Sequence, residues 1–542
     1  MRITKISLSN FRSFKERQEI DIAPVTLLFG PNSVGKSSVL MALAYVQQIL
    51  EKGHCDPQEL DALGDKTIGG FRSLVHGGDL NKTIGIRLDL ALGNTIYPSV
   101  DEDFEYLAER FNAEPLQLNE FSGSVEHFAL EISVAWSHTL EKAYVQSYQV
   151  WINQQFMGRI SSSDDGKQTL ISQLNLLHPL ALTEIEHAQL QMTPEDWLTE
   201  FNTVAEDIPE LSSTRLESVL DELIPGHFTK LPGLDSLSYA GVRPYGRDIG
   251  VECQWGAIPA PGSQLQTNLR YSELEPTQEH LNYLMVTNFL TSAFLEPINL
   301  ARRFLKAYVA IGPVRVIPDF DYVPNPNPEQ RHWADGRAAW DLLHRNPKAN
   351  DENQRLIREC NRWLSDEDKL NTGYELKNWS LFESLSSGER YEDDSHYLVR
   401  KRHLLFMQKG KQYPLAASQL GTGISQVIPV LVAALHENLQ LISVEQPELH
   451  LHPRFQVELG DLFLSCSKDR SFLIETHSEH LVLRLLRRIR ERNGITPDQI
   501  AVVYLSAGEN GVVSERQVVT EDGDFEHNWP DGFFDERDEE LF

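Results

Sequence analysis

The most specific chemical pattern in the sequence is a glycine-rich segment, residues 30–38, that matches G-x-x-x-x-G-K-[ST] in full. Its glycines allow backbone N–H groups to curl toward phosphate oxygens, and a helix that begins near Lys36 directs its positive dipole end to the same point. Lys36 is expected to reach the β- and γ-phosphates, and the Ser37 hydroxyl to ligate Mg²⁺. The predicted nucleotide-binding residues of this loop are Gly30, Asn32, Ser33, Gly35, Lys36, Ser37 and Ser38.

A second chemical cluster follows an apolar strand that the pattern predicts at 439–444. Because a buried strand fixes the residue at its end, Glu445 is suited to anchor Mg²⁺. Further along the chain, a strand predicted at 472–474 precedes His477, whose imidazole can hydrogen-bond a γ-phosphate. Hydrolysis needs a metal-anchoring acid and a group that orients water, so these strand ends are candidate catalytic positions.

A third candidate is the loop at 420–426, Leu-Gly-Thr-Gly-Ile-Ser-Gln, which opens an apolar helix. Its backbone N–H groups and the helix terminus suit a second contact with an anion. The residues predicted to make that contact are Gly421, Gly423 and Ser425.

The hydrophobic pattern predicts the elements that must hold these clusters. A strand at 25–29, the phosphate loop and a helix from 36 to about 50 form the start of a nucleotide-binding α/β layer. Alternating runs between 84 and 160 predict a β-meander. Helical patterns fall in an acidic stretch at 181–224, at 278–310, at 336–344 and at 352–364, and Pro, Gly and Ser accumulate at 225–263.

Two α/β segments at the ends of the chain therefore bracket a large insertion of mixed character. The predicted parts are an N-terminal part of an α/β ATPase head (1–90), an insertion with a β-meander followed by helical and irregular segments (91–400), a C-terminal part of the head (401–515) and an acidic aromatic tail (516–542).

In this order, the motifs resemble the ABC-type ATPase heads of the structural-maintenance-of-chromosomes (SMC) and OLD (overcoming lysogenization defect) families. The resemblance covers roughly 1–90 and 400–510. It makes 420–426 the signature loop, 439–445 the Walker B strand, 447–453 the D-loop region and His477 the switch histidine. It also implies ATP and Mg²⁺ as cofactors, and it implies that Arg12, in the Asn-Phe-Arg element, lies near the nucleotide.

The same resemblance implies a partner chain. In such families two heads associate head to tail, and each nucleotide lies between one phosphate loop and the signature loop of the other head. Since this chain has one of each, at least a homodimer is expected.

The acid pair that usually ends the Walker B strand is replaced here by Glu445 and Gln446. Glutamine is neutral, so it can orient water but cannot act as a general base. Glu448 is the nearest replacement acid, and Pro447 fixes a turn between the two. We therefore expect slow hydrolysis and long-lived ATP-bound dimers, with Gln446, Glu448 and His477 as the catalytic candidates. The alternative is a scaffold whose ATP is bound and not hydrolysed.

Composition limits the remaining possibilities. The 542 residues carry 49 Lys+Arg against 79 Asp+Glu, a net charge of −30, which argues against a surface that coats nucleic acid throughout. A basic stretch at Arg484–Arg492 leaves two interpretations open: ion pairs and a solvated helix face, or a nucleic-acid phosphate track. Four widely separated cysteines are typical of a reducing cytoplasm, and the longest apolar run, 427–435, is too short to span a membrane.

The tail and the absence of a fused effector guide the biological hypothesis. The segment 529–534, Trp-Pro-Asp-Gly-Phe-Phe, lies among acids and favours docking on a partner or on the head itself; it resembles a C-terminal ending of bacterial AAA-type ATPases. The sequence lacks the patterns of His-Asn-His and TOPRIM nucleases. By analogy with the ATPase subunit of Septu, the first hypothesis is a gate for a separate nuclease in anti-phage defence; a DNA-repair ATPase of the recombination-mediator type is the other.

Overall fold

The computed structural model describes residues 1–98, 104–183, 186, 214–224, 248–271, 277–345, 351–384, 397–411, 413–492, 494–527 and 529. The chain divides into two compact units, which are considered separately. Unit 1 comprises Met1–Phe11, Val46–Asp56 and Phe71–Arg303, and unit 2 comprises Arg12–Tyr45, Pro57–Gly70 and Phe304–Phe542.

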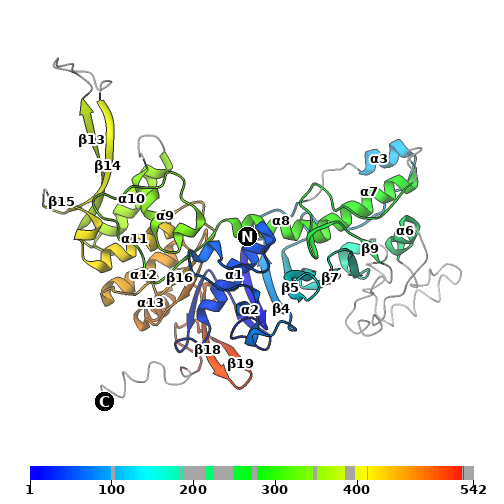
Figure 1. Ribbon diagram of the computed structural model, residues 1–542, viewed down its shortest axis with the longest axis horizontal. Helices are drawn as coiled ribbons and strands as arrows, with labels where there is room; N and C mark the ends of the chain where they lie inside the picture. The colour runs from blue at the N-terminus through cyan, green and yellow to red at the C-terminus, as the bar shows by residue number, and fades with distance from the viewer. Residues whose placement is uncertain are drawn as a thin grey trace. The chain divides into compact units, whose positions relative to one another are not determined.

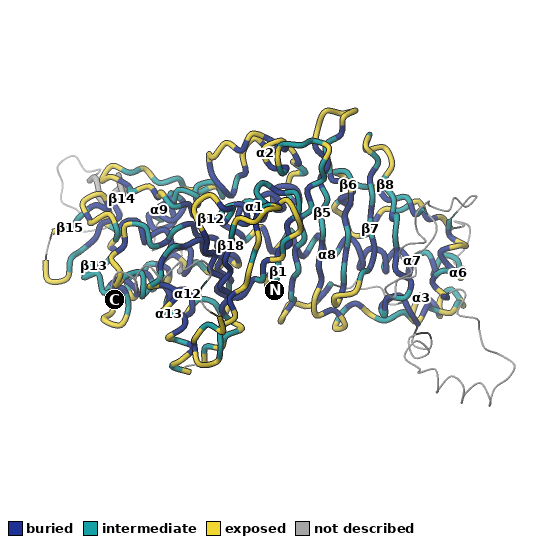
Figure 2. The backbone as a smooth tube through the Cα atoms, turned by 90° about the horizontal axis from the view of Figure 1, so that it is seen from below, coloured by how far each residue is buried: buried dark blue, intermediate teal, exposed yellow. Residues whose placement is uncertain are grey.

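Unit 2 is built on a sheet with the strand order β12-β16-β17-β3-β18-β19. The strands pair in parallel except for the last pair, which is an antiparallel hairpin. Strands β3, β12, β16 and β17 are short runs that are buried along their whole length, as parallel sheets require, whereas β18 is exposed at its end and most of β19 is not buried. Figure 2 shows buried backbone beside the label of β18. Their bounds are β3 Val25–Phe29, β12 Tyr308–Ile311, β16 Leu441–Glu445, β17 Ser471–Glu475, β18 Ile500–Gly508 and β19 Gly511–Gln517, with β2 (Gln18–Asp21) beside β19.

Helices surround this sheet. They are α1 Lys36–Lys52, whose residues from Val46 onward are assigned to unit 1, and α9 Arg337–His344, α10 Asp351–Ser365, α11 Thr422–Leu435, α12 Pro453–Cys466 and α13 Glu479–Arg490. Helices α9 to α13 contribute to the same hydrophobic core as the strands. A long hairpin of β13 (Tyr374–Ser384) and β14 (Tyr397–Gln408) extends away from α9, α10 and α11 (Figure 1). The short strand β15 (Pro414–Leu415) pairs with β14. Short 3₁₀ turns complete the unit at Asp61–Leu63, Gln330–Trp333, Ala417–Gln419 and Pro497–Gln499.

Unit 1 carries the predicted β-meander. Its antiparallel strands follow the order β1-β4-β5-β6-β7-β8-β9, and β4 to β8 are neighbours in chain order, which confirms the meander. The strand bounds are β1 Arg2–Ser9, β4 Ile84–Ala91, β5 His127–Ser137, β6 Lys142–Ile152, β7 Gln155–Ser162, β8 Thr169–Leu174, β9 Ile249–Gly250, β10 Cys253–Trp255 and β11 Ile258–Pro259. The helices are α2 Phe71–Leu74, α3 Phe104–Phe111, α6 Arg215–Leu223 and α7 Gln278–Leu290, with 3₁₀ turns at His76–Gly78 and Pro179–Ala181.

The predicted helix at 278–310 requires a correction at its end. Helix α7 continues through a π-helical turn, Thr291–Leu295, into α8 (Glu296–Lys306), but residues 308–311 form β12. These four apolar residues are fully buried and pair in parallel with β16, so burial in the sheet overrides the helical pattern. The predicted acidic helices at 181–224 lie largely outside the described residues.

The boundaries of unit 2 differ from the predicted head. Because β12 joins the sheet, residues 304–400, which the sequence pattern assigned to the insertion, belong to the unit that carries the phosphate loop.

The tail packs on the sheet through Trp529. Its ring lies on Phe29, the last residue of β3, with 5.4 Å between the ring centroids, and it also contacts Tyr504 and Phe525. The described part of the tail thus docks on its own head. Among the described residues, none of the helices has the length and apolarity to cross a membrane.

Candidate functional site

The phosphate loop lies at the carboxyl edge of the sheet because β3 is flanked by parallel β17 and β18. Gly30 and Gly35 have φ values of +138° and +126°, which only glycine adopts readily. A Cβ atom would lie 2.2 Å from the Leu505 carbonyl oxygen at the first position and 2.2 Å from the Ser13 hydroxyl at the second. Backbone conformation and close packing therefore both demand glycine at these motif positions.

Lys36 begins α1 and is almost fully buried, with 3% of its surface exposed. Its ammonium donates to the carbonyls of Gly30, at 2.8 Å, and Pro31, at 2.9 Å. Burial lowers the pKa of Lys36, and the carboxylates of Glu475 and Glu448 oppose that shift. The loop thus holds a cation at its centre, where a phosphate would be received, while Asn32 and Ser33 are exposed at its tip and Ser38 is buried.

The Ser37 hydroxyl donates a 2.7 Å hydrogen bond to Oε2 of Glu475, the last residue of β17. Glu475 and Glu445 are register partners on neighbouring parallel strands, so both carboxylates lie at the same edge. Burial raises the pKa of Glu475 against the hydrogen bond from Ser37, and the charge of Glu445 raises it further. Sequence reasoning assigned the metal to Ser37 and Glu445 and gave Glu475 no role.

Glu445 itself pairs with a lysine that sequence reasoning missed. Nζ of Lys66 lies 3.2 Å and 3.5 Å from the two carboxylate oxygens of Glu445. Lys66 lies on the loop after α1 and is 379 positions away along the chain, without a motif around it. Only the three-dimensional structure brings this cation to the strand end.

The donor set of this edge fits Mg²⁺. A hydroxyl and two carboxylates are hard oxygen donors, and Mg²⁺ in nucleotide sites is bound by one or two carboxylates together with phosphate oxygens and water. Within the described part of the chain, no cluster of three or more His, Cys, Asp or Glu side chains is arranged to hold a metal. A metal here would therefore depend on phosphate oxygens to complete its coordination.

Gln446 and Glu448 follow β16 in a tight turn. Gln446 has a left-handed φ of +47°, and its N–H donates to the Glu475 carbonyl at 2.7 Å. Glu448 accepts 2.8 Å hydrogen bonds from the Thr476 hydroxyl and from the His477 N–H. Both oxygens of this carboxylate therefore hold the segment after β17, an arrangement that favours a positioning role over water activation. Burial raises the pKa of Glu448, and these two hydrogen bonds oppose the shift.

His477 lies at the end of the strand next to the phosphate loop, because the Thr476 N–H bonds the Leu28 carbonyl of β3. Burial lowers the pKa of His477, and the Lys36 ammonium lowers it further. A neutral imidazole carries one N–H donor and one acceptor nitrogen, and its N–H can donate to a phosphate oxygen, which suits a sensor of phosphate.

The predicted signature loop opens α11, with Gly421 as the N-cap. Gly421 and Thr422 are exposed, whereas the Ser425 hydroxyl is buried and donates to the Ala417 carbonyl at 2.7 Å. Gly423 lies against the D-loop region, since a Cβ there would approach the His450 carbonyl oxygen to 2.6 Å. The N-terminus of the helix is therefore exposed, and Ser425 holds the loop.

Arg315 is the second residue that sequence reasoning missed. Its side chain is 2% exposed and its guanidinium donates to the carbonyls of Gln426, Glu445 and Gln446. Burial lowers the pKa of Arg315 to about 10, and the charges of Glu448 and Glu445 oppose that shift. One buried cation thus joins the end of β16 to the start of α11.

The segment that contains Arg12 lies in unit 2. Arg12 has a φ of +51° and precedes Ser13, whose hydroxyl lies against Gly35, so its segment lies beside the phosphate loop. Its contact with nucleotide stays a prediction.

The arginines of 484–492 form ion pairs with Glu458, Asp461, Glu491, Asp522 and Asp524. This network favours the first interpretation of the basic stretch, intramolecular ion pairs.

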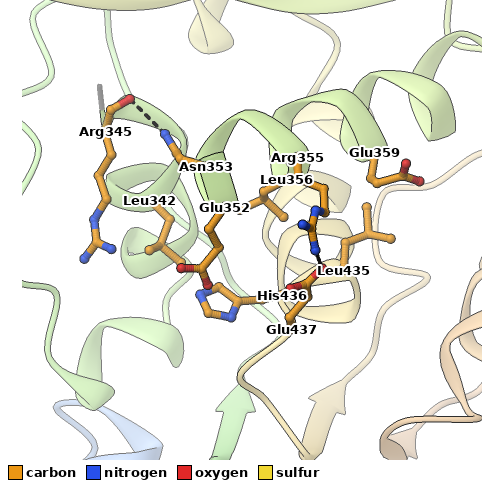
Figure 3. A pocket seen from close by; sticks show the side chains of 10 residues that line it. All are labelled: Leu342, Arg345, Glu352, Asn353, Arg355, Leu356, Glu359, Leu435, His436 and Glu437. Carbon is orange, nitrogen blue, oxygen red and sulfur yellow. Dashed lines mark hydrogen bonds and ion pairs between the residues drawn. The ribbon is translucent and has the colours of Figure 1, made fainter. Parts of the chain in front are cut away.

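One cavity of unit 2 borders the candidate site, and another lies away from it. A cavity of about 300 Å³ borders Glu445 and Lys66 and is walled by Val314, Arg331 and Arg337. A much smaller one, about 50 Å³, lies between α10 and the end of α11, where Arg355 pairs with Glu437 beside His436 (Figure 3). None of the predicted site residues lines the smaller cavity.

Family models match three parts of the chain. Residues 1–72 match a family described as "AAA ATPase domain", and residues 296–484 match one described as "AAA domain, putative AbiEii toxin, Type IV TA system". Residues 495–542 match a family described as "Protein of unknown function (DUF3696)". The first match contains the phosphate loop, and the second contains Glu445 and His477. The segments on both sides of 73–295 are thus similar to AAA-type ATPase families. A comparison with curated proteins gave no match.

Solved structures similar to the chain include SMC heads. An SMC head domain from Thermotoga maritima is 10% identical, with a TM-score of 0.35 over 95% of this chain and 99% of that chain. An SMC head bound to the C-winged helix domain of ScpA is 8% identical, with a TM-score of 0.37 over 96% and 99%. One bound to the C-terminal domain of ScpA, derived from Pyrococcus furiosus, is 9% identical, with a TM-score of 0.36 over 95% and 96%.

Proposed function

We propose that this chain is an ABC/SMC-like ATPase head that binds Mg-ATP and transmits its nucleotide state to a partner. The observation that carries the proposal is the convergence of Lys36, Ser37, Glu445, Glu475 and His477 at the carboxyl ends of neighbouring parallel strands. Lys36 and the loop amides bind phosphates, Ser37 and Glu445 hold Mg²⁺, and His477 reports on the γ-phosphate. When bound, Mg²⁺ neutralises phosphate charge as the terminal bond breaks.

The nucleotide is bound between two copies arranged head to tail. This step is supported by the exposed N-terminus of α11, which presents Gly421 and Thr422, and by the single phosphate loop of each chain. An anion bound in one head would meet the positive dipole end of that helix in the other. ATP then bridges the two heads, and its hydrolysis lets them separate.

Hydrolysis is slow in this proposal, and a specific observation supports it. Gln446 has no ionisable group, and the carboxylate of Glu448 is engaged by Thr476 and His477. Because neither of these two side chains is placed to act as the base, these heads stay closed for long periods, and Gln446 orients the attacking water. The same observation favours the second candidate, a scaffold that holds ATP without hydrolysing it and restrains a nuclease partner.

The biological role is proposed by analogy: control of a separate nuclease in anti-phage defence. The DNA-repair alternative would require the arginines of 484–492 to engage nucleic acid. Since those arginines have carboxylate partners in the structure, the protein-effector role is the better supported one.

The test compares Lys36→Ala with Lys52→Ala, which removes an exposed lysine from the other end of the same helix. We expect Lys36→Ala to weaken ATP binding by about 10- to 100-fold, because a charge-assisted contact with phosphate is lost. It should also abolish ATP-dependent dimers. Calorimetry and light scattering measure both quantities. Undiminished ATP affinity in Lys36→Ala would contradict the proposal. Phosphate release from the wild type, followed over days, distinguishes the two candidates: a slow ATPase releases phosphate, and a scaffold that only holds ATP does not.

A further inference from the structure

An acidic side chain lies closer to the metal-binding hydroxyl than the acid predicted from the sequence. Oε2 of Glu475 is 2.7 Å from Oγ of Ser37, the atom that ligates Mg²⁺ in nucleotide-binding phosphate loops. The side chain is largely buried at the end of β17, the strand between β3 and β16. A carboxylate on this central strand is therefore aimed at the metal position.

The expected metal acid is engaged by a cation instead. Nζ of Lys66 contacts both oxygens of the Glu445 carboxylate, so one of the two negative charges at this edge is already balanced by the protein. The direct contact of Glu475 is instead the neutral hydroxyl of Ser37, while the nearby charges of Lys36 and Lys66 favour its carboxylate form. The two register-paired carboxylates thus differ in their direct partners.

We propose that Glu475 is a second carboxylate ligand for the nucleotide-bound Mg²⁺, acting with Ser37, and that Lys66 balances the charge of Glu445 so that both acids can share one site. Two carboxylates, a hydroxyl and phosphate oxygens match the hard-oxygen coordination that Mg²⁺ requires. This inference deepens the proposed function and rests on it.

The competing explanation is that Glu475 only orients the Ser37 hydroxyl. The substitution Glu475→Gln separates the two explanations. A glutamine can still accept the hydrogen bond of the Ser37 hydroxyl through its amide oxygen, so it keeps the orienting contact, but it lacks the negative charge of a carboxylate ligand. Loss of the Mg²⁺-dependent gain in ATP affinity in Glu475→Gln, with ATP binding in EDTA maintained, therefore indicates a metal ligand and not an orienting group.

The experiment measures ATP affinity by calorimetry with and without Mg²⁺ for the wild type, Glu475→Gln, Glu475→Asp and Glu445→Gln. Asp469→Asn is the matched control, because it removes one exposed charge just before the amino end of the same strand. We expect Glu475→Gln to lower the gain in affinity from Mg²⁺ by about 10- to 100-fold and to keep or improve metal-free binding. Glu475→Asp should retain most of the gain, and Asp469→Asn all of it.

A second readout uses Mn²⁺ in place of Mg²⁺ and follows its binding by electron paramagnetic resonance with ATP present. Weaker Mn²⁺ binding in Glu475→Gln supports the assignment. If Glu475→Gln keeps the full metal gain while Glu445→Gln loses it, Glu445 alone is the carboxylate ligand and the inference is overturned. If the wild type binds no ATP, the proposed function fails first, so the two failures are distinguishable.

Discussion

Arg315 and Gln426 are joined by hydrogen bonds in both directions, although 111 positions separate them in the chain. The Arg315 N–H donates to Oε1 of Gln426 at 3.2 Å, and Nε2 of Gln426 donates to the Arg315 carbonyl at 2.6 Å. The guanidinium then bonds the Gln426 carbonyl and the carbonyl of Glu445. Arg315 therefore ties the first turns of α11 to the end of β16.

We expect Arg315→Lys to lower the free energy of unfolding by about 1–3 kcal/mol. A lysine keeps the charge, but its single ammonium cannot reproduce the planar fork that reaches three carbonyls, and buried acceptors are left without donors. Arg331→Lys is the control, since its guanidinium is 39% exposed in surface ion pairs and should change stability by about 0.5 kcal/mol or less. Urea denaturation measures both.

Arg315→Lys also tests whether Arg315 couples the end of β16 to α11 when the dimer forms. If it does, Arg315→Lys should weaken ATP-dependent dimerisation more than it weakens ATP binding to the monomer. Equal losses of the two affinities would reduce Arg315 to a purely structural residue.

Replacement by alanine should lower stability at one glycine of loop 420–426 and leave stability unchanged at another. At Gly423 a Cβ would approach the His450 carbonyl oxygen to 2.6 Å, so Gly423→Ala should cost about 1–3 kcal/mol of stability through overpacking. At Gly421 the φ of −60° suits any residue, and a Cβ would meet nothing within 4 Å. Gly421→Ala should leave the midpoint of thermal unfolding unchanged.

Gly421→Ala is informative for the dimer. This position is exposed at the start of α11, so a methyl group there should impair ATP-dependent dimerisation only if another chain approaches closely. Light scattering with ATP measures the effect. Full ATP-dependent dimerisation of Gly421→Ala, with the stability of that variant unchanged, would argue against the signature-loop assignment.

The parts of the site that the sequence predicted are those with local patterns. The phosphate loop combines a glycine-rich motif with a flanking strand and helix, and β16 and β17 are short apolar runs that end in polar residues. Their convergence follows from parallel pairing, which brings Glu445 and Glu475 to the same edge. Parallel α/β layers are predictable because strand, loop and helix alternate along the chain.

The parts that could not be predicted depend on contacts between distant segments. Lys66 reaches Glu445 across 379 positions, and Arg315 follows β12, a strand that continues an apolar helical pattern. The direction of the Glu448 carboxylate depends on a turn at Pro447 whose geometry no periodicity encodes. Similarly, Trp529 packs on Phe29, a contact between the two ends of the chain that the tail sequence alone does not specify.

A buried histidine of unit 1 gives a prediction for the pH dependence of stability. His178 is 2% exposed; its Nδ1 accepts from the Leu180 N–H, and its Nε2 bonds the Ile152 carbonyl. Burial lowers the pKa of His178 to about 4. As pH falls below about 6.5, the unfolded chain takes up a proton at this histidine while the folded chain does not, so the folded state loses stability.

Between pH 7 and pH 5 this difference amounts to about 2 kcal/mol, at about 1.4 kcal/mol per pH unit below pH 6.5. His178→Asn keeps an acceptor for the Leu180 N–H and cannot be protonated, so its stability should fall less across this range although it is lower at pH 7. His138→Asn, which replaces an exposed imidazole, should retain the wild-type slope. Unfolding in urea at the two pH values measures the slopes; equal slopes for the wild type and His178→Asn would contradict the prediction, because then the buried imidazole takes up its proton as readily in the folded chain as in the unfolded one.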